Sequence, residues 1–120
     1  MALRGVRGAT CLSADDKAEM GEAVGELLTV MMERNSLTSD DIVSIILTGT
    51  PDLTCAFPAA GARAIGLVDV PLLCAAEMDV AGALARVVRV LMHVEVDRPR
   101  AEIAHVYLRG AEVLRQDLIQ

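Results

Sequence analysis

The sequence predicts a single small α+β domain, in which roughly five strands form a mixed sheet and two helices pack on one of its faces. Two observations predict it. Short apolar runs with a period of two recur along the chain, and one segment has clear helical spacing. The expected order is strand, helix, strand, helix and then three strands. The chain has 120 residues and no repeat, linker or low-complexity segment, so we expect one domain over residues 1–120.

The first half of the chain contains the clearest helix, between two strands. Residues 3–10 alternate weakly, and their small side chains leave room for another element to approach the backbone, so we predict a strand there. Ser13–Asp16 has the form of an acidic capping box. A helix is expected over residues 14–34, closed by Asn35, because apolar residues follow at helical spacing. Residues 41–48 predict a second strand, apolar enough to be covered on both faces.

The second half begins with a short helix and continues as strands. Residues 57–66 are predicted to form the helix, since Pro58 suits its first turn and Gly66 its end. Three further strands are expected at residues 70–74, 86–96 and 104–108. Pro71 places the first of these at an edge of the sheet or at its own start. The tail, residues 112–120, has no clear pattern.

Composition excludes several classes of partner. The net charge of −6 argues against nucleic acid or an anionic membrane as a partner. No apolar run approaches the roughly 20 residues of a membrane span, and the N-terminus lacks the apolar stretch of a signal peptide. Apolar residues make up 53% of this short chain, which suggests that some apolar surface is buried between subunits.

The three cysteines, at positions 11, 55 and 74, indicate a reducing compartment. Their number is odd and no two have CxxC spacing, so neither a disulfide framework nor a zinc site is expected. A cytoplasmic location fits best. His93 and His105 are interpreted as structural residues, and no metal site is predicted. The sequence has no phosphate-binding loop, dinucleotide fingerprint or nucleophile signature.

Arg89 is the most informative residue, because it lies in a strand that otherwise reads as core. In residues 86–96, a period of two places Val88 and Val90 on one face, and Arg89 and Leu91 on the other. Burial of an unpaired cation costs several kcal/mol. Either a carboxylate of this chain or a ligand must therefore pair with Arg89.

Two more arginines, Arg7 and Arg63, could join Arg89 in a site. Guanidinium groups present planar donors that match carboxylates, so convergence of these residues would bind a dianionic small molecule. The alternative is that Arg7 and Arg89 form structural ion pairs with acidic residues of the chain, such as Glu77, Glu95 and Asp79. The residues alone leave both interpretations open.

Tyr107, Cys74 and Glu77 are further candidates. The Tyr107 hydroxyl lies on the face opposite Val106 and Leu108, where it would donate to a ligand or simply cover the sheet edge. Cys74 and Glu77 lie at and beyond the end of a strand, a common ligand-binding position in α/β sheets. Cys74 has no histidine near it in sequence, so a small buried apolar role is favoured over a nucleophile.

Five separated blocks together resemble one family. The blocks are Arg4–Thr10, Thr50–Leu53 with Phe57–Ala59, Glu77–Val80 ahead of Arg89–Val90, His105–Leu108 and Val113–Leu118. They resemble the monofunctional bacterial chorismate mutases of the trimeric α/β-barrel-like class, which is distinct from the all-helical class. The match runs nearly end to end. The resemblance implies an isomerase of the shikimate pathway that converts chorismate to prephenate for phenylalanine and tyrosine biosynthesis without a cofactor. It also implies a homotrimer, built as a pseudo-α/β barrel with active sites between subunits.

The resemblance also implies roles for individual residues. Arg7 and Tyr107 would hold a substrate carboxylate, and Arg89 would face the ether oxygen and the side-chain carboxylate. Glu77 and the Cys74 region would bind the ring hydroxyl. The pocket lining and its mouth would comprise Phe57, Ala59, Leu73, Leu114, Arg63 and Arg115. The rearrangement would be accelerated by selection of the compact substrate conformer and by stabilisation of charge on the ether oxygen.

The chain departs from the family pattern at a few positions. Ala60 stands where well-known members carry a lysine, and Leu73 replaces a small polar residue. The segment at residues 66–69 is one residue shorter than the corresponding segment of the family. Two other functions stay open. One is a trimeric small-molecule binding or regulatory protein without turnover, and the other is a trimer similar to the enamine/imine deaminases.

Overall fold

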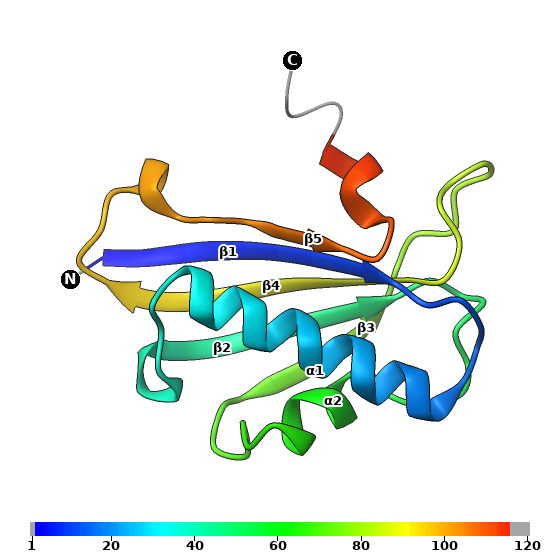
Figure 1. Ribbon diagram of the computed structural model, residues 1–120, viewed down its shortest axis with the longest axis horizontal. Coiled ribbons are helices and arrows are strands. Elements are labelled where there is room, and N and C mark those ends of the chain that lie inside the picture. The colour runs from blue at the N-terminus through cyan, green and yellow to red at the C-terminus, as the bar shows by residue number, and fades with distance from the viewer. Residues whose placement is uncertain (1, 116–120) are drawn as a thin grey trace.

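The computed structural model describes residues 2–115, with the backbone alone described at Arg115. A five-stranded sheet carries two helices across one face (Figure 1). The strands are β1 (Ala2–Cys11), β2 (Ile42–Gly49), β3 (Leu72–Ala76), β4 (Val87–Val96) and β5 (Val106–Leu108). The helices are α1 (Lys17–Arg34) and α2 (Ala59–Ala64), with 3-10 turns η1 (Ser39–Asp41), η2 (Arg100–Glu102) and η3 (Ala111–Arg115).

The sheet is mixed, with strand order β3-β2-β4-β1-β5. Strand β4 is antiparallel to both of its neighbours, β1 and β2, whereas β5 runs parallel to β1 and β3 runs parallel to β2. The predicted order and the mixed sheet are therefore confirmed. So is the placement of Pro71, which directly precedes the edge strand β3.

Helix α1 begins three residues later than predicted, because Asp16 and not Ser13 caps it. The Asp16 carboxylate accepts a hydrogen bond from the Glu19 backbone N–H at 2.8 Å, and the Glu19 carboxylate reaches back to the Ser13 N–H at 2.8 Å. The prediction that Asn35 closes the helix is confirmed. Its side-chain amide donates to the carbonyls of Met31 and Ala104, at 2.8 and 2.9 Å.

The main core lies between the sheet and α1. Alternate residues of β4 point into it, as the period of two predicted, and they meet the apolar stripe of α1. Gly8 of β1 allows the helix to come close, because a Cβ there would lie 2.4 Å from the Met31 sulfur. The small residues of β1 therefore do admit another element to the backbone.

The other face of the sheet is largely open, which corrects the expectation that β2 is covered on both sides. Val43 of β2 is 43% exposed, and Leu91 of β4 is also exposed. Among the described residues, a second apolar cluster forms where η3 folds over the end of β1; its buried members are Ala9, Val87 and Ala111. A strand that is apolar on both sides does not itself supply the cover for both.

The segment after β5 forms η3, which the sequence left without a prediction. Residues 116–120 lie outside the described part of the chain. Among the described residues, no helix combines the length and the apolar character that a membrane span requires.

Candidate active site

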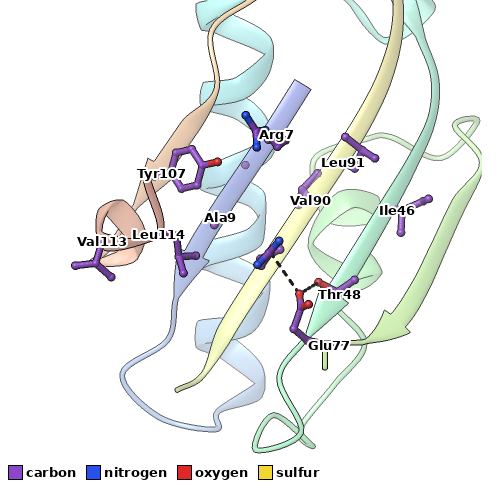
Figure 2. A pocket seen from close by; sticks show the side chains of 12 residues that line it. Arg7, Ala9, Ile46, Thr48, Glu77, Val90, Leu91, Tyr107, Val113 and Leu114 are labelled. Atoms are coloured by element: carbon purple, nitrogen blue, oxygen red, sulfur yellow. Dashed lines mark hydrogen bonds and ion pairs between the residues drawn. The ribbon is translucent and has the colours of Figure 1, made fainter. Parts of the chain in front are cut away.

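A cavity of about 550 Å³ lies on the open face of the sheet. Strands β1, β2, β4 and β5, the segment after β3 and the turn η3 all contribute to its wall (Figure 2). The lining residues are Arg7, Gly8, Ala9, Ile46, Thr48, Glu77, Arg89, Val90, Leu91, Tyr107, Val113 and Leu114. The two strand arginines singled out by the sequence therefore meet at one cavity.

Strand register aligns the polar residues of this cavity in one row across the sheet. Thr48 pairs with Arg89, Arg89 pairs with Ala9, and Ala9 pairs with Tyr107. Paired residues on neighbouring strands point to the same face. Because Ala9 has the smallest side chain of the row, the sheet is hollowed between the Arg89 guanidinium and the Tyr107 ring.

Arg89 pairs with Glu77, as one of the two interpretations required. The Arg89 Nε lies 3.4 Å from a Glu77 carboxylate oxygen, and that oxygen accepts a hydrogen bond from the Thr48 hydroxyl at 2.7 Å. The Glu77 backbone N–H also donates to the Gly49 carbonyl at 2.9 Å. Figure 2 shows the Glu77 carboxylate joined to its partners. Glu77 is thus fixed on β2 and orients the guanidinium.

The expectation of a buried Arg89 is wrong for this chain. Its side chain is 54% exposed, because the strand face that carries it is the open one. The desolvation penalty that demanded a counter-charge is therefore small here. What the geometry retains is a guanidinium held at the wall of a cavity by a single carboxylate of the described residues.

Arg7 and Tyr107 form the opposite wall. The Arg7 backbone N–H donates to the His105 Nδ1 at 2.9 Å, which ties the segment before β5 to β1. The Tyr107 ring packs against the second apolar cluster, and its hydroxyl points toward Arg7 (Figure 2). The hydroxyl and the guanidinium are therefore placed to share one anionic group.

The remaining predicted site residues fall into two groups. Leu114 lines the same cavity as Arg7, Glu77, Arg89 and Tyr107. Five others do not line it: Phe57, Ala59, Arg63, Leu73 and Cys74. They lie on or near α2 and β3, at the far side of the sheet from β5. The Arg115 side chain lies outside the described residues.

The second group differs in exposure. Three of its members are exposed: Phe57 at 72%, Leu73 at 62%, and Arg63 of α2. Ala59 is buried in the main core, and Cys74 packs against that core. Large apolar side chains left in solvent indicate a contact surface rather than a core.

Sequence reasoning missed several lining residues, among them Ala9, Thr48, Ile46, Leu91 and Val113. A signal for two of them was present. Ala9 and Leu91 each lie two residues from a strand arginine, so they share its face. Thr48 and Ile46 required the register between β2 and β4, which no local pattern encodes.

Neither a metal nor a reactive thiol stands out in the described residues. No cluster of three or more metal-binding side chains occurs there. The three cysteines are free thiols. Burial, followed by the nearby Glu112 carboxylate, raises the pKa of Cys11, and burial with the Asp15 hydrogen bond raises the pKa of Cys55. A raised pKa reduces thiolate, and hence nucleophilicity.

Comparison with known proteins assigns the chain to a family. Residues 3–118 match the family described as chorismate mutase type I. The chain is 42% identical over 119 residues to the protein named chorismate mutase AroH of Bacillus subtilis, covering 98% of this chain and 94% of the relative. It is 46% identical over 117 residues to chorismate mutase AroH of Thermus thermophilus, covering 97% and 96%.

A solved structure supports the fold independently. The chorismate mutase of Clostridium thermocellum superposes with a TM-score of 0.89 at 46% identity, covering 91% of this chain and 97% of that one. The family match, the two relatives and the fold thus agree along nearly the whole sequence, and they favour a mutase over an imine deaminase. This chain belongs to the type I chorismate mutase family of isomerases, as the resemblance of its sequence blocks had indicated.

Proposed function

We propose that this chain converts chorismate to prephenate in the cavity on the open sheet face, as a step of aromatic amino acid biosynthesis. One observation carries the proposal: Arg7 and Arg89, on neighbouring strands, line a single cavity together with Tyr107 and Glu77. Two guanidinium groups suit a substrate with two carboxylates. A carboxylate beside them suits its ring hydroxyl.

The residues have distinct roles in this proposal. Arg7 and the Tyr107 hydroxyl, which lie on adjacent strands, hold one substrate carboxylate. Arg89 faces the ether oxygen and the second carboxylate. Glu77 accepts a hydrogen bond from the ring hydroxyl, and Leu114 covers the apolar side of the ring. Each role uses a group that already lines the cavity.

The reaction is a unimolecular rearrangement, so the protein needs neither a nucleophile nor a cofactor. Clamping both carboxylates selects the compact conformer in which the two carbons to be joined lie close together. As the C–O bond breaks, negative charge gathers on the ether oxygen, and a guanidinium fixed in advance stabilises that charge without reorganisation. The Thr48–Glu77–Arg89 chain of contacts supports such a fixed guanidinium.

We further propose that the active protein is a cytoplasmic homotrimer, a pseudo-α/β barrel in which each site lies between two subunits. Phe57, Arg63 and Leu73 are exposed and lie outside the cavity of their own chain. In the trimer these exposed members of the second group would complete the cavity of a neighbouring copy. Ala59 and the Cys74 region, which pack in or against the main core, would support them from within their own chain. The open, partly apolar face of the sheet would then be covered by another subunit.

The first experiment is a direct assay. Pure protein in the presence of a metal chelator is mixed with chorismate, and loss of the chorismate absorbance is followed. Turnover without any added cofactor supports the proposal. Tight binding of chorismate without turnover would instead identify a binding or regulatory protein. Hydrolysis of an imine substrate, with chorismate unchanged, would identify a deaminase.

A second experiment tests the shared site. Arg89→Gln removes one of the two cavity arginines, and a double variant, Phe57→Ala with Arg63→Gln, alters two exposed residues of the second group. If each site combines two subunits, random co-assembly of the two inactive chains restores about a quarter of the wild-type sites. Activity that stays at the sum of the two parents places each site within one chain. Sedimentation equilibrium gives the number of chains in each assembly.

A further inference from the structure

Arg109 lies outside the cavity, yet it makes the densest ionic contact of the described residues. Its Nε donates to a Glu26 carboxylate oxygen at 3.0 Å, and one terminal nitrogen donates to Glu22 at 3.1 Å. The other terminal nitrogen lies 4.0 Å from Glu19. All three carboxylates belong to α1, on the opposite side of the sheet from the cavity. Arg109 therefore reaches around the edge of the sheet.

We propose that Arg109 is a positioning residue for the active site: its contacts with Glu19, Glu22 and Glu26 hold the β5–η3 segment against the sheet, and so keep Tyr107 and Leu114 in the cavity wall. This inference rests on the proposed function for its kinetic consequence. Its structural consequence, the fixed placement of Tyr107, does not depend on that function.

The β5–η3 segment, residues 106–115, is short and lies at the edge of the sheet. Strand β5 is an edge strand with only three residues paired to β1, from Val106 to Leu108. The chain then reverses through Arg109 and Gly110, both with positive φ, at 53° and 91°. A non-glycine residue in this region is strained and persists only where its surroundings hold it. The ion cluster sits at that strained turn, between the two wall residues.

On the cavity side, η3 is held by one small apolar cluster. Ala111 is fully buried there, and Leu114 and Tyr107 pack at its margin. The segment is thus held from both faces of the sheet. The second apolar cluster holds it on the cavity face, and Val106 in the main core and the Arg109 ion pairs hold it on the face of α1. Figure 1 shows η3 and η2 at opposite ends of the segment that contains β5. Loss of the Arg109 ion pairs removes the contact that holds the turn between β5 and η3 to α1.

The cluster differs from an ordinary surface salt bridge. A single exposed pair contributes little, but the Arg109 side chain is only 29% exposed and serves three carboxylates. Those carboxylates stand three or four residues apart on one helix, where like charges repel. Hydrogen bonds from Arg109 to Glu26 and Glu22 raise the pKa of the guanidinium. Removal of Arg109 therefore also leaves three acids unneutralised.

The test is Arg109→Gln, with Arg100→Gln as the matched control. Arg100 is an exposed arginine of η2, so both variants lose one positive charge. If substrate must re-order a loosened β5–η3 segment, the apparent affinity falls by the fraction of molecules already ordered. We expect KM for chorismate to rise about 3- to 10-fold with kcat within about twofold. Arg109→Lys, which keeps the charge, should recover part of the loss, and Arg100→Gln should match the wild type.

A spectroscopic measurement follows Tyr107 directly. The chain has one tyrosine and no tryptophan, so the near-UV circular dichroism of the tyrosine band reports on Tyr107 alone. Arg109→Gln should weaken that band in the absence of substrate, and Arg100→Gln should leave it unchanged. If the wild-type protein did not turn over chorismate, the proposed function would be contradicted. The spectral comparison would still test whether Arg109 fixes the position of Tyr107.

Charge removal on α1 gives a second route if Arg109→Gln does not fold. The double variant Glu22→Gln with Glu26→Gln removes the hydrogen-bonded partners and should reproduce the rise in KM and the weaker band. Adding Arg109→Gln to it should then change little, because coupled residues are not additive. The inference is overturned if KM and the tyrosine band stay at wild-type values in both variants, or if kcat alone falls.

Discussion

At the scale of single residues, Arg89 gains its meaning from its neighbours. A half-exposed guanidinium is unremarkable on a protein surface, but this one stands opposite Thr48 and Ala9 and is paired with Glu77. The Thr48 hydroxyl holds the Glu77 carboxylate that orients the guanidinium, and the small Ala9 side chain leaves space beside it. Together they turn a surface charge into a preorganised one, which is the property that electrostatic catalysis requires.

Replacement of Arg89 tests that interpretation. Arg89→Gln should lower kcat by roughly 10²–10³, the scale of losing one preorganised donor. Arg89→Lys should also be poor, because a flexible point charge does not reproduce a planar fork. The fold should persist, since the side chain is half exposed, and far-UV circular dichroism would check this. Normal turnover by Arg89→Gln would remove the electrostatic assignment.

Cys74 tests the mechanism from the opposite direction. Its side chain packs against the main core, and the proposed rearrangement uses no nucleophile. Cys74→Ser should therefore keep kcat within about tenfold of the wild-type value, with a modest loss of stability from a partly buried hydroxyl. Steady-state kinetics with chorismate measure this. Near-complete inactivation of a folded Cys74→Ser protein would revive covalent catalysis.

Residue types in the site could be predicted from the sequence better than their surroundings could. Arg7, Arg89, Glu77 and Tyr107 are polar residues in or beside strands, and the family resemblance gave each a role. Their partners depend on which residues of different strands lie opposite one another. Thr48 meets Arg89 only through the register of β2 with β4, and that register is a property of the folded sheet.

At the scale of elements, the crossing of α1 and α2 depends on glycine. A Cβ on Gly61 would lie 2.7 Å from the Val24 Cβ and 3.1 Å from the Gly25 backbone nitrogen. Neither atom is the flexible end of a side chain. Helix α2 can therefore approach α1 only where a side chain is missing, and α2 carries Arg63, an exposed residue of the second group.

Two glycine substitutions separate close packing from helix propensity. Gly61→Ala should destabilise the protein by about 1–3 kcal/mol, because the overpacked helices must move apart. Gly21→Ala, in α1 with nothing within 4 Å of the added carbon, should stabilise it by about 0.5–1 kcal/mol. Urea unfolding gives both values. Equal effects of the same sign would show that close approach does not set the helix crossing.

Elements with a strong period were predicted well, and short ones were not. Helix α1 and strand β4 each repeat their pattern over several turns or alternations, so the central residues of both elements were predicted correctly. The strand at residues 104–108 shortens to Val106–Leu108, and η3 was not predicted. A three-residue strand and a 3-10 turn contain too few positions for any period to emerge, and tertiary contacts decide them.

At the scale of the whole molecule, Asp15 joins two distant loops. Its carboxylate accepts hydrogen bonds from the Thr54 N–H at 2.9 Å, the Thr54 hydroxyl at 2.7 Å and the Cys55 N–H at 3.0 Å. Hydrogen bonds from Cys55 and Thr54 lower the pKa of Asp15 from 3.8 to about 2. The segment before α1 is thereby held to the segment that leads into α2.

This contact predicts a component of acid unfolding. Because the folded-state pKa is the lower one, the stabilisation is complete above pH 3.8 and is lost as the pH falls toward about 2. Asp15→Asn should lack this component, so its stability should depend less steeply on pH in that window. Asp69→Asn, an exposed acid, serves as the control. Urea midpoints measured from pH 2 to pH 6 compare the variants, and parallel curves for all three proteins would contradict the prediction.

The overall architecture followed from the sequence because apolar periodicity specifies layers. It did not specify the open face. Val43 and Leu91 read as buried residues, and in this chain they face outward. Local patterns record that a side chain prefers to leave water, and in the proposed trimer a second copy of the chain would satisfy that preference as well as the chain itself could.

The row from Thr48 through Arg89 and Ala9 to Tyr107 limits how this protein can change in length. One residue inserted in β1 between Arg7 and Ala9 would turn one of them toward α1 and spoil the core and the cavity together. The exposed segment from Met78 to Ala85, by contrast, joins β3 to β4 without belonging to any strand. Natural variation and engineered insertions should therefore accumulate in such connections, while the strands that carry the row keep a constant count.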